Sequence, residues 1–363
     1  MKGIAFAFTM PACFRALIAV LPALLAIAAP AFAGDGTNSR AEASAAQSWT
    51  VSLYFENDLF FTGRDEDYTN GWKLSWISPD VNEYRQAGRI PGEIYRLFEA
   101  LPVINQPAAK RNVVLALGHK MYTPSDIERE DLIEDDRPYA AWLYMSVALH
   151  NKTRERLDSL EVSLGVVGPL ARGKHFQNFV HRRRGLPEAQ GWDNQIGNEP
   201  GINLIGERKI RRNIIGTGER WGMDGIVHFG GSLGNVFTYL NAGTTVRAGW
   251  NLPQDFGASL IRFAGDSNAP AASEDVRFRE GAWGANLFAG FDARAVFRDI
   301  TLDGNTFRDS HSVDRRPIVG DFYTGFALVR GRWKFSYAQT VRTRTYENGR
   351  RHIFGSINVS RTF

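Results

Sequence analysis

The sequence predicts an all-β chain that closes into an antiparallel transmembrane β-barrel of about twelve strands, with a short extracellular loop helix. Three observations predict this fold. Apolar and polar residues alternate with a period of two in many short segments, as in strands with one apolar and one polar face. After the N-terminal region no run approaches about 18 apolar residues, which excludes membrane-spanning helices. A closed barrel is then the remaining way to satisfy every backbone group in lipid.

Residues 1–33 have the pattern of a cleaved secretory signal peptide. An apolar run over residues 16–29 is followed by Ala31-Phe32-Ala33, which fits a small-x-small cleavage site. The run is short for a membrane anchor, and Pro22 interrupts it. Cleavage after Ala33 removes Cys13, the only cysteine, so the mature chain can form neither a disulfide nor a Cys-based zinc site.

The remaining composition suits a folded barrel preceded by a short lead. Residues 34–47 are small and polar and predict a flexible segment, which leaves residues 48–363 for the barrel and its loops. With 44% hydrophobic residues, the chain can build a core. The formal charge of +4, from 43 basic and 39 acidic residues, is too even for a nucleic-acid-binding surface.

The alternation is strict in the first predicted strand, at 48–56, where Leu53 and Phe55 fall on one face and Tyr54 and Glu56 on the other. Polar faces carry charged residues beside Gly and Ser, as a crowded, wet lumen would, and aromatic residues lie near strand ends, as in an interfacial girdle. A soluble sandwich also alternates, but neither feature favours it. Strong or weak versions of the pattern recur at 71–78, 111–119, 140–150, 158–166, 200–209, 226–235, 241–250, 281–291, 319–330, 332–343 and 354–363.

Polar inserts separate some of these strands, and one of them contains a predicted helix. The largest inserts are 79–110, 121–138, 168–199 and 251–280. In the segment 174–184, Phe176, Phe179 and Val180 share one face at helical spacing. We expect this short helix in an extracellular loop lying over the barrel mouth.

Three polar clusters are candidates for chemistry. Glu56-Asn57-Asp58 ends the first strand, 65–71 leads into the second, and His181 belongs to the predicted helix, with Glu188 shortly after it. Carboxylate, amide and hydroxyl oxygens on adjacent strand ends suit Ca²⁺. His181 can serve as a general base on water, since imidazole titrates near neutrality. The plainer interpretations are turn residues and a basic helix face that contacts phosphates.

Other hydrolase signatures are missing from the sequence. The seven histidines form no HxxxH pair, which disfavours a zinc hydrolase. There is no GxSxG, which disfavours a nucleophile-elbow serine esterase. A water-based hydrolysis without an acyl-enzyme fits both observations.

Six ordered motifs together resemble the outer-membrane lipid A 3′-O-deacylase family, LpxR. The resemblance spans about residues 48–205 by motif and extends to the terminal Phe363 through the barrel pattern. The motifs are Phe55-Glu56-Asn57-Asp58, Asp67-Tyr68-Thr69-Asn70-Gly71, Asp136-Arg137-Pro138-Tyr139-Ala140, Gly165-Val166-Val167-Gly168-Pro169, Gln177-Asn178 with His181, and Gly191-Trp192-Asp193-Asn194-Gln195.

The resemblance implies a twelve-stranded barrel in the outer membrane of a Gram-negative bacterium, with lipid A as substrate and the site between the barrel wall and a loop helix near the outer leaflet. It implies Ca²⁺-dependent hydrolysis of the 3′-linked acyloxyacyl ester. By motif match, Asn57 and Asp58 correspond to the family's Asn-Asp pair, Thr69 to its threonine and His181 to its catalytic histidine. Asp58 would hold the metal in part, and Glu188 would orient the imidazole or help to hold the site.

One departure and several alternatives stand beside this resemblance. The family has a basic residue in the loop before the Asp-Arg motif, whereas this chain has an acidic loop in which only Arg129 is available. An outer-membrane phospholipase would use the same chemistry on another lipid. A non-catalytic barrel, a pore or an adhesin, would need the polar clusters only as turns, and a soluble periplasmic β protein is a further alternative.

Overall fold

The computed structural model describes residues 47–58, 67–87, 104–106, 109–216, 221–257, 261 and 265–363. The expected signal peptide at 1–33 and the lead at 34–47, apart from its last residue, lie outside the described residues. None of the described helices combines the length and hydropathy that a membrane-spanning helix needs.

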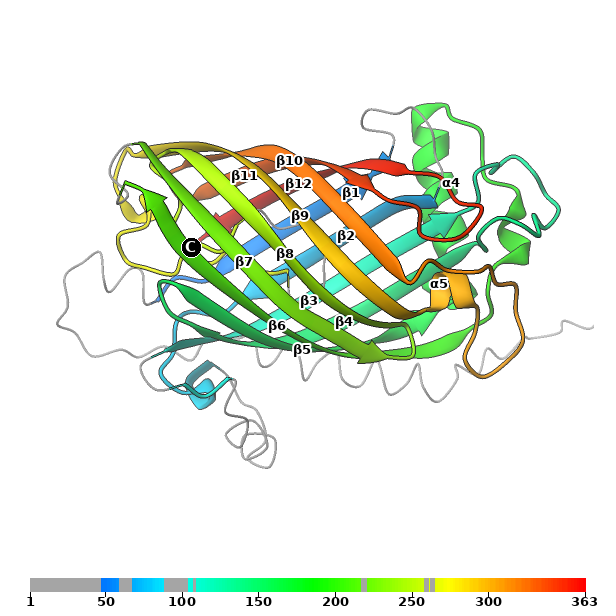
Figure 1. Cartoon of the computed structure of the whole chain (residues 1–363), viewed down its shortest axis with the longest axis horizontal. Helices are drawn as coiled ribbons and strands as arrows, with labels where there is room; N and C mark the ends of the chain where they lie inside the picture. The colour runs from blue at the N-terminus through cyan, green and yellow to red at the C-terminus, as the bar shows by residue number, and fades with distance from the viewer. Residues whose placement is uncertain are drawn as a thin grey trace, which may run out of the picture.

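The described chain forms a closed barrel in which each strand pairs antiparallel with its sequence neighbours and β1 also pairs with β12, so no sheet edge is left open (Figure 1). The prediction of twelve strands is confirmed, and each predicted segment overlaps one strand. The strands are β1 (Thr50–Asn57), β2 (Asp67–Ile77), β3 (Lys110–Thr123), β4 (Ala140–Lys152), β5 (Arg156–Val167), β6 (Glu199–Ile215), β7 (Trp221–Gly234), β8 (Phe237–Trp250), β9 (Trp283–Asp299), β10 (Ile318–Arg330), β11 (Trp333–Arg342) and β12 (His352–Thr362).

The outer face of the wall is the face that meets lipid. Large apolar side chains stand exposed on it, with Ile202 at 54% and Leu287 at 70%, whereas their strand neighbours that point inward are buried. Soluble proteins do not expose apolar surface over a whole wall. Trp250 lies between Trp221 and Trp283 with ring centroids 6.2 and 6.3 Å away, a cluster typical of a membrane-interface girdle. The protein is therefore an outer-membrane barrel.

The two ends of the barrel differ. We call the end where β1 begins and β12 ends the terminal end, and the opposite end the loop end. The loop end carries the connection 168–198 with helix α4 (Gly173–Arg184) and the connection 300–317 with helix α5 (Ile300–Asp303) (Figure 1). Short 3₁₀ turns complete the described structure: η2 (Tyr84–Ala87), η3 (Pro169–Ala171), η4 (Gly191–Asn194) and η5 (Val276–Phe278).

A connection from the terminal end folds back into the lumen. We call the described residues between β8 and β9, namely 251–257, 261 and 265–282, the lumen plug. Its Asp266 forms a 2.6 Å ion pair with Lys73 of β2, and its Asp255 forms a 2.7 Å pair with Lys334 of β11. All four of these side chains are almost fully buried, so the plug replaces water around the inward-facing charges.

Candidate active site

Two polar residues end β1 at the loop end. By the alternation of the strand, Asn57 belongs to the outward-facing set with Leu53 and Phe55, and it lies directly opposite Asn70 of β2. Phe55 is exposed to lipid, but Asn57 is only 8% exposed and Asp58 only 1%. An amide and a carboxylate are thus buried at successive residues where β1 ends, the amide in line with the outward-facing set of the strand.

The loop that carries α4 packs against this outer wall. A buried apolar cluster joins outward residues of β3, β4 and β5 to the loop, including Met121 and Ala141 on the wall and Ala171 and Trp192 on the loop. Gly173 begins α4 in close contact with Ala141 and Trp192, where a Cβ atom would come within 2.4 Å of the Trp192 ring. The absence of a side chain there allows the first turn of the helix to approach the wall.

An aromatic contact continues the docking along the helix. His119, buried on β3, contacts the Ala171 carbonyl oxygen through Nε2 at 2.8 Å. Phe176 of α4 lies 4.9 Å from the His119 ring and 6.3 Å from the Trp72 ring of β2, centroid to centroid. The helix prediction at 174–184 is confirmed, but its expected place over the barrel mouth is wrong. The helix lies beside the outer wall because Trp72 and His119 offer an aromatic surface there.

His181 lies one turn beyond this contact and is buried in the structure. Its Nδ1 atom is hydrogen-bonded to the carbonyl oxygen of Pro187, in the segment that follows α4. A carbonyl only accepts, so Nδ1 carries the proton in this arrangement. The lone pair of the neutral imidazole is then on Nε2, which is the arrangement a general base needs.

Motif residues hold the segment that supplies this carbonyl. The Asn178 side chain accepts a hydrogen bond from the Ala189 amide at 3.1 Å and donates one to the Ala189 carbonyl at 3.4 Å. Gln177 accepts a 2.6 Å hydrogen bond from the Trp192 indole. The returning segment is therefore tied to α4 one turn before His181, which fixes the place of the Pro187 carbonyl.

The Glu188 carboxylate forms a 3.0 Å ion pair with Arg182 at the surface. Because the Pro187 carbonyl accepts from His181 Nδ1, this place suits the second of the two roles expected for Glu188, that of helping to hold the site, and its role stays a prediction. The side chain of Thr69 lies outside the described residues, although its backbone belongs to β2 at an irregularity between Asp67 and Asn70. Arg129 is exposed.

The Asp-Arg motif after the acidic loop ties the extracellular connections together. The Asp136 carboxylate accepts hydrogen bonds from the Ser125 amide at 2.8 Å and from the Tyr346 hydroxyl at 2.5 Å. The Asp136 carbonyl oxygen contacts His311 Nε2 at 2.8 Å. Three connections of the loop end therefore meet at Asp136.

The next residues of that motif face opposite sides of the wall. Arg137 is buried at the loop end of the lumen, donates to Thr301 of α5 at 2.7 Å, and lies over the Tyr122 ring. Burial lowers the pKa of Arg137 to about 10, so it stays charged at neutral pH. Tyr139 faces outward and packs 4.9 Å from Trp192, centroid to centroid. The motif thus links the lumen to the α4 loop.

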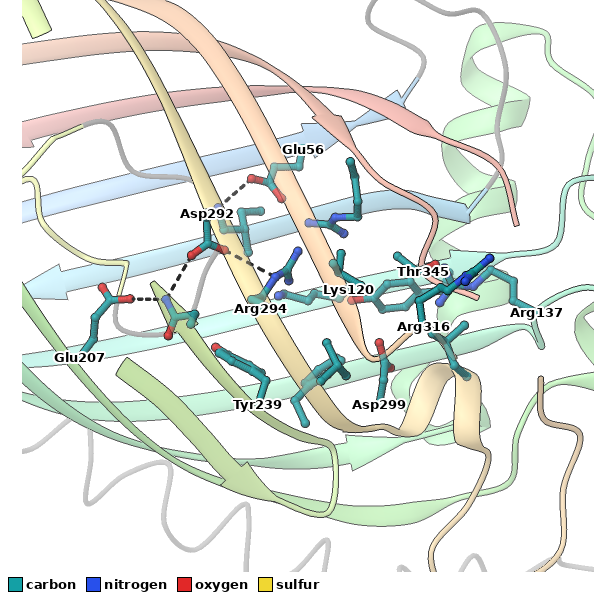
Figure 2. Close-up of a pocket in the computed structure, with 18 residues that line it drawn as sticks. Glu56, Lys120, Arg137, Glu207, Tyr239, Asp292, Arg294, Asp299, Arg316 and Thr345 are labelled. Atoms are coloured by element: carbon teal, nitrogen blue, oxygen red, sulfur yellow. Dashed lines mark hydrogen bonds and ion pairs between the residues drawn. The ribbon is translucent and has the colours of Figure 1, made fainter. Parts of the chain in front are cut away.

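A second polar region lies inside the barrel, across the wall from the α4 loop. The lumen holds a cavity of about 80 Å³. Figure 2 shows the side chains of Glu56 from β1, Lys120 from β3, and Asp292 and Arg294 from β9 pointing into it. Two of its ionic groups pair with each other, Arg294 with Asp292 at 3.5 Å, and Arg294 also pairs with Asp321 behind the lining at 2.9 Å. The cavity has room for several waters but not for a lipid headgroup.

The residues at the strand end fit a calcium ion by the chemistry of their oxygens. Ca²⁺ prefers carboxylate and amide oxygens, and Asp58 and Asn57 present these groups, both buried, at adjacent positions. Among the residues that the structure describes, no three His, Cys, Asp or Glu side chains are grouped so as to hold a metal.

Two contributors to the arrangement were not predicted from the sequence. His119 was detectable, because it is a polar residue on the otherwise apolar outward series of β3. The Pro187 carbonyl was not, because a main-chain acceptor has no sequence signal. Its place depends on the tertiary clamp made by Asn178.

Comparisons with known proteins agree with this architecture. The family model described as "Outer membrane protein LpxR" matches residues 18–363. LpxR from Salmonella typhimurium, at 20% identity, matches 86% of this chain and 100% of its own with a TM-score of 0.68, which shows a shared fold. The β domain of the Bordetella autotransporter BrkA matches at 8% identity and TM-score 0.39, covering 87% of this chain and 99% of its own. No curated protein matches the chain.

Proposed function

Because the chain belongs to the LpxR family of outer-membrane proteins, we propose that it is a lipid A deacylase that hydrolyses the 3′-linked acyloxyacyl ester. The single observation that supports the chemistry best is the buried His181, whose Nδ1 is engaged by the Pro187 carbonyl where the α4 loop meets the outer wall. In this tautomer the lone pair is on Nε2, which is the nitrogen that would take a proton from water.

In the proposed reaction, His181 removes a proton from water as the water attacks the ester carbonyl directly. The tetrahedral intermediate then expels the sugar oxygen, which takes the proton back from the imidazolium. The products are a free acyloxyacyl acid and a 3′-hydroxyl on the sugar. The Pro187 carbonyl keeps the ring oriented during both transfers and accepts from Nδ1 throughout.

Asn57 and Asp58 would hold Ca²⁺, which when bound supplies an electrophile that stabilises negative charge on the ester oxygen. Thr69, on the neighbouring strand, would help to position water or substrate. Glu188 would act at a distance by holding Arg182, and so the end of α4, in place.

Access from the membrane fits the outer location of these groups. Phe176 and Phe179 of α4 are 40% and 53% exposed, and Phe55 of the wall is 45% exposed beside the Asn57 strand end. Apolar side chains at this level can contact the acyl chains of a lipid that reaches the site from the outer leaflet. The substrate then does not need to enter the lumen.

The test is the lipid A of a Gram-negative host that expresses the chain. We expect mass spectra to show loss of one acyloxyacyl group with the parent protein and no loss with His181→Ala. His175→Ala is a matched control, because His175 lies on the same helix with an exposed side chain. Fatty acid release from purified phospholipid, with lipid A untouched, would instead identify a phospholipase.

A further inference from the structure

We propose that the lumen plug is a positioning element for the site on the outer wall, and that it acts through Glu56. This inference rests on the proposed function. It concerns residues on the opposite face of the wall from Asn57 and Asp58, none of which contacts the lipid-facing surface.

The plug contacts β1 at the last three inward positions before the strand end, Ser52, Tyr54 and Glu56. Asn268 of the plug lies 3.3 Å from the hydroxyls of both Ser52 and Tyr54, through its side-chain nitrogen. The Tyr54 hydroxyl also donates to Asp266 of the plug at 3.0 Å. These contacts run along the inner face of β1, the strand that ends in the Asn-Asp pair.

The last contact lies beside the pair itself. The Glu56 carboxylate accepts a 2.7 Å hydrogen bond from the main-chain amide of Ile261 in the plug and a 2.9 Å hydrogen bond from the Ser356 hydroxyl of β12. Glu56 is 3% exposed, and Figure 2 shows its side chain directed into the lumen cavity. Glu56 therefore joins the plug, β1 and β12 one residue before Asn57.

The end of β1 needs this support because its neighbours continue past it. Asn57 pairs with Asn70 of β2 and Gly355 of β12, whereas β2 and β12 extend further toward the loop end at Asp67 and His352. Among the described residues, the ladder of β1 with both neighbours ends at Asn57, and Asp58 follows directly after it. Displacements of about 1 Å at such a position are enough to lower a rate by about 100-fold.

The inference is tested with Glu56→Ala and Glu56→Gln, the second of which keeps an oxygen that accepts both hydrogen bonds. We measure kcat, KM and the Ca²⁺ concentration for half-maximal deacylation on purified, folded barrel. We expect Glu56→Ala to lower kcat about tenfold and to raise the half-maximal Ca²⁺ concentration about tenfold, with KM little changed, and Glu56→Gln to stay within about twofold of the parent.

The matched control is Glu207→Ala, which removes another lumen carboxylate that lines the same cavity from β6. We expect it to keep the parent kcat and Ca²⁺ response. If Glu56→Ala fails to fold, Tyr54→Phe removes a single hydroxyl from the same contact surface and is expected to shift both parameters about threefold in the same direction.

Three results would overturn the inference. The first is a folded Glu56→Ala variant with the kcat and Ca²⁺ response of the parent. The second and third are a loss of kcat in Glu56→Gln, or in Glu207→Ala, as large as the loss in Glu56→Ala. A parent that releases no acid refutes the proposed function alone. In that case Ca²⁺ binding is measured directly, as the rise in Tm of the barrel when Ca²⁺ is added. The positioning inference requires that Ca²⁺ raises the Tm of the parent and that Glu56→Ala reduces this rise. If either result is absent, the inference fails.

Discussion

The Nδ1 atom of His181 is hydrogen-bonded to the main-chain carbonyl of Pro187, six residues further along the chain. A main-chain acceptor cannot be removed by substitution, so this orientation is tested from the ring side. We expect His181→Gln to lower deacylation by about 100- to 10,000-fold, because an amide is not a base at neutral pH. Initial rates of acid release from lipid A give the measurement. A rate within about tenfold of the parent would contradict the role of base.

The Asn178 clamp predicts a defect in rate without a defect in folding. Asn178→Ala removes both hydrogen bonds to Ala189 and so loosens the segment that carries Pro187. We expect kcat to fall about tenfold while the Tm of the barrel stays near the parent value. Lys174→Ala is the control, since its ion pair with Asp193 is exposed and contributes little. Equal kcat in both variants would argue against the clamp.

The contact between His119 and Ala171 predicts that docking of the α4 loop depends on one hydrogen bond from the wall. His119→Leu removes it, whereas His119→Gln can still donate to the Ala171 carbonyl. We expect the leucine variant to lose about tenfold in activity and to show faster proteolysis of the α4 loop, and the glutamine variant to recover most of both. Similar proteolysis of the two variants would show that the ring contacts with Phe176 suffice.

Removal of calcium is expected to abolish acid release and to leave the barrel folded. A chelator should reduce the rate of acid release by the parent to background, and addition of excess Ca²⁺ should restore that rate. Asp58→Asn keeps the size of the side chain but removes its charge, so we expect at least about a tenfold higher Ca²⁺ requirement. Mg²⁺ is the control ion, because its smaller octahedral shell suits a flexible oxygen site poorly. Full activity in a chelator would remove Ca²⁺ from the proposal.

The strands were predictable because their signal is local. A strand such as β11 alternates Trp333 and Phe335 outward with Lys334 and Ser336 inward, and this pattern survives any choice of partner strand. The inward lysine indicated a polar lumen. It did not indicate the plug, because Lys334 meets Asp255 only through folding of a long connection.

The same distinction applies to the site. Asn57 and Asp58 could be proposed because they are adjacent oxygen donors at a predicted strand end and match one motif of the resemblance, and their role stays a prediction. The position of α4 beside the wall was not, because it depends on the complementary surfaces of Gly173, Trp192 and His119, which come from three separate segments. The resemblance gave Glu188 either the role of orienting the imidazole or that of helping to hold the site. Sequence could not decide between them, because a main-chain carbonyl, that of Pro187, accepts from His181 Nδ1.

The plug predicts how the stability of the barrel responds to acid. Burial disfavours a charged Asp255, but Lys334, Arg277 and Arg247 outweigh it and hold the pKa of Asp255 below its usual range. A carboxyl with a depressed folded pKa contributes stability above the unfolded pKa of about 3.9, and this contribution is lost as the pH falls further toward the folded value. We expect Asp255→Asn to destabilise the barrel at pH 7 by about 3 kcal/mol and to flatten the decline of Tm below about pH 4. Thermal unfolding in detergent, followed by tryptophan fluorescence across this pH range, gives both numbers. A variant that keeps the parent's slope below pH 4 would show that other carboxylates carry the acid response.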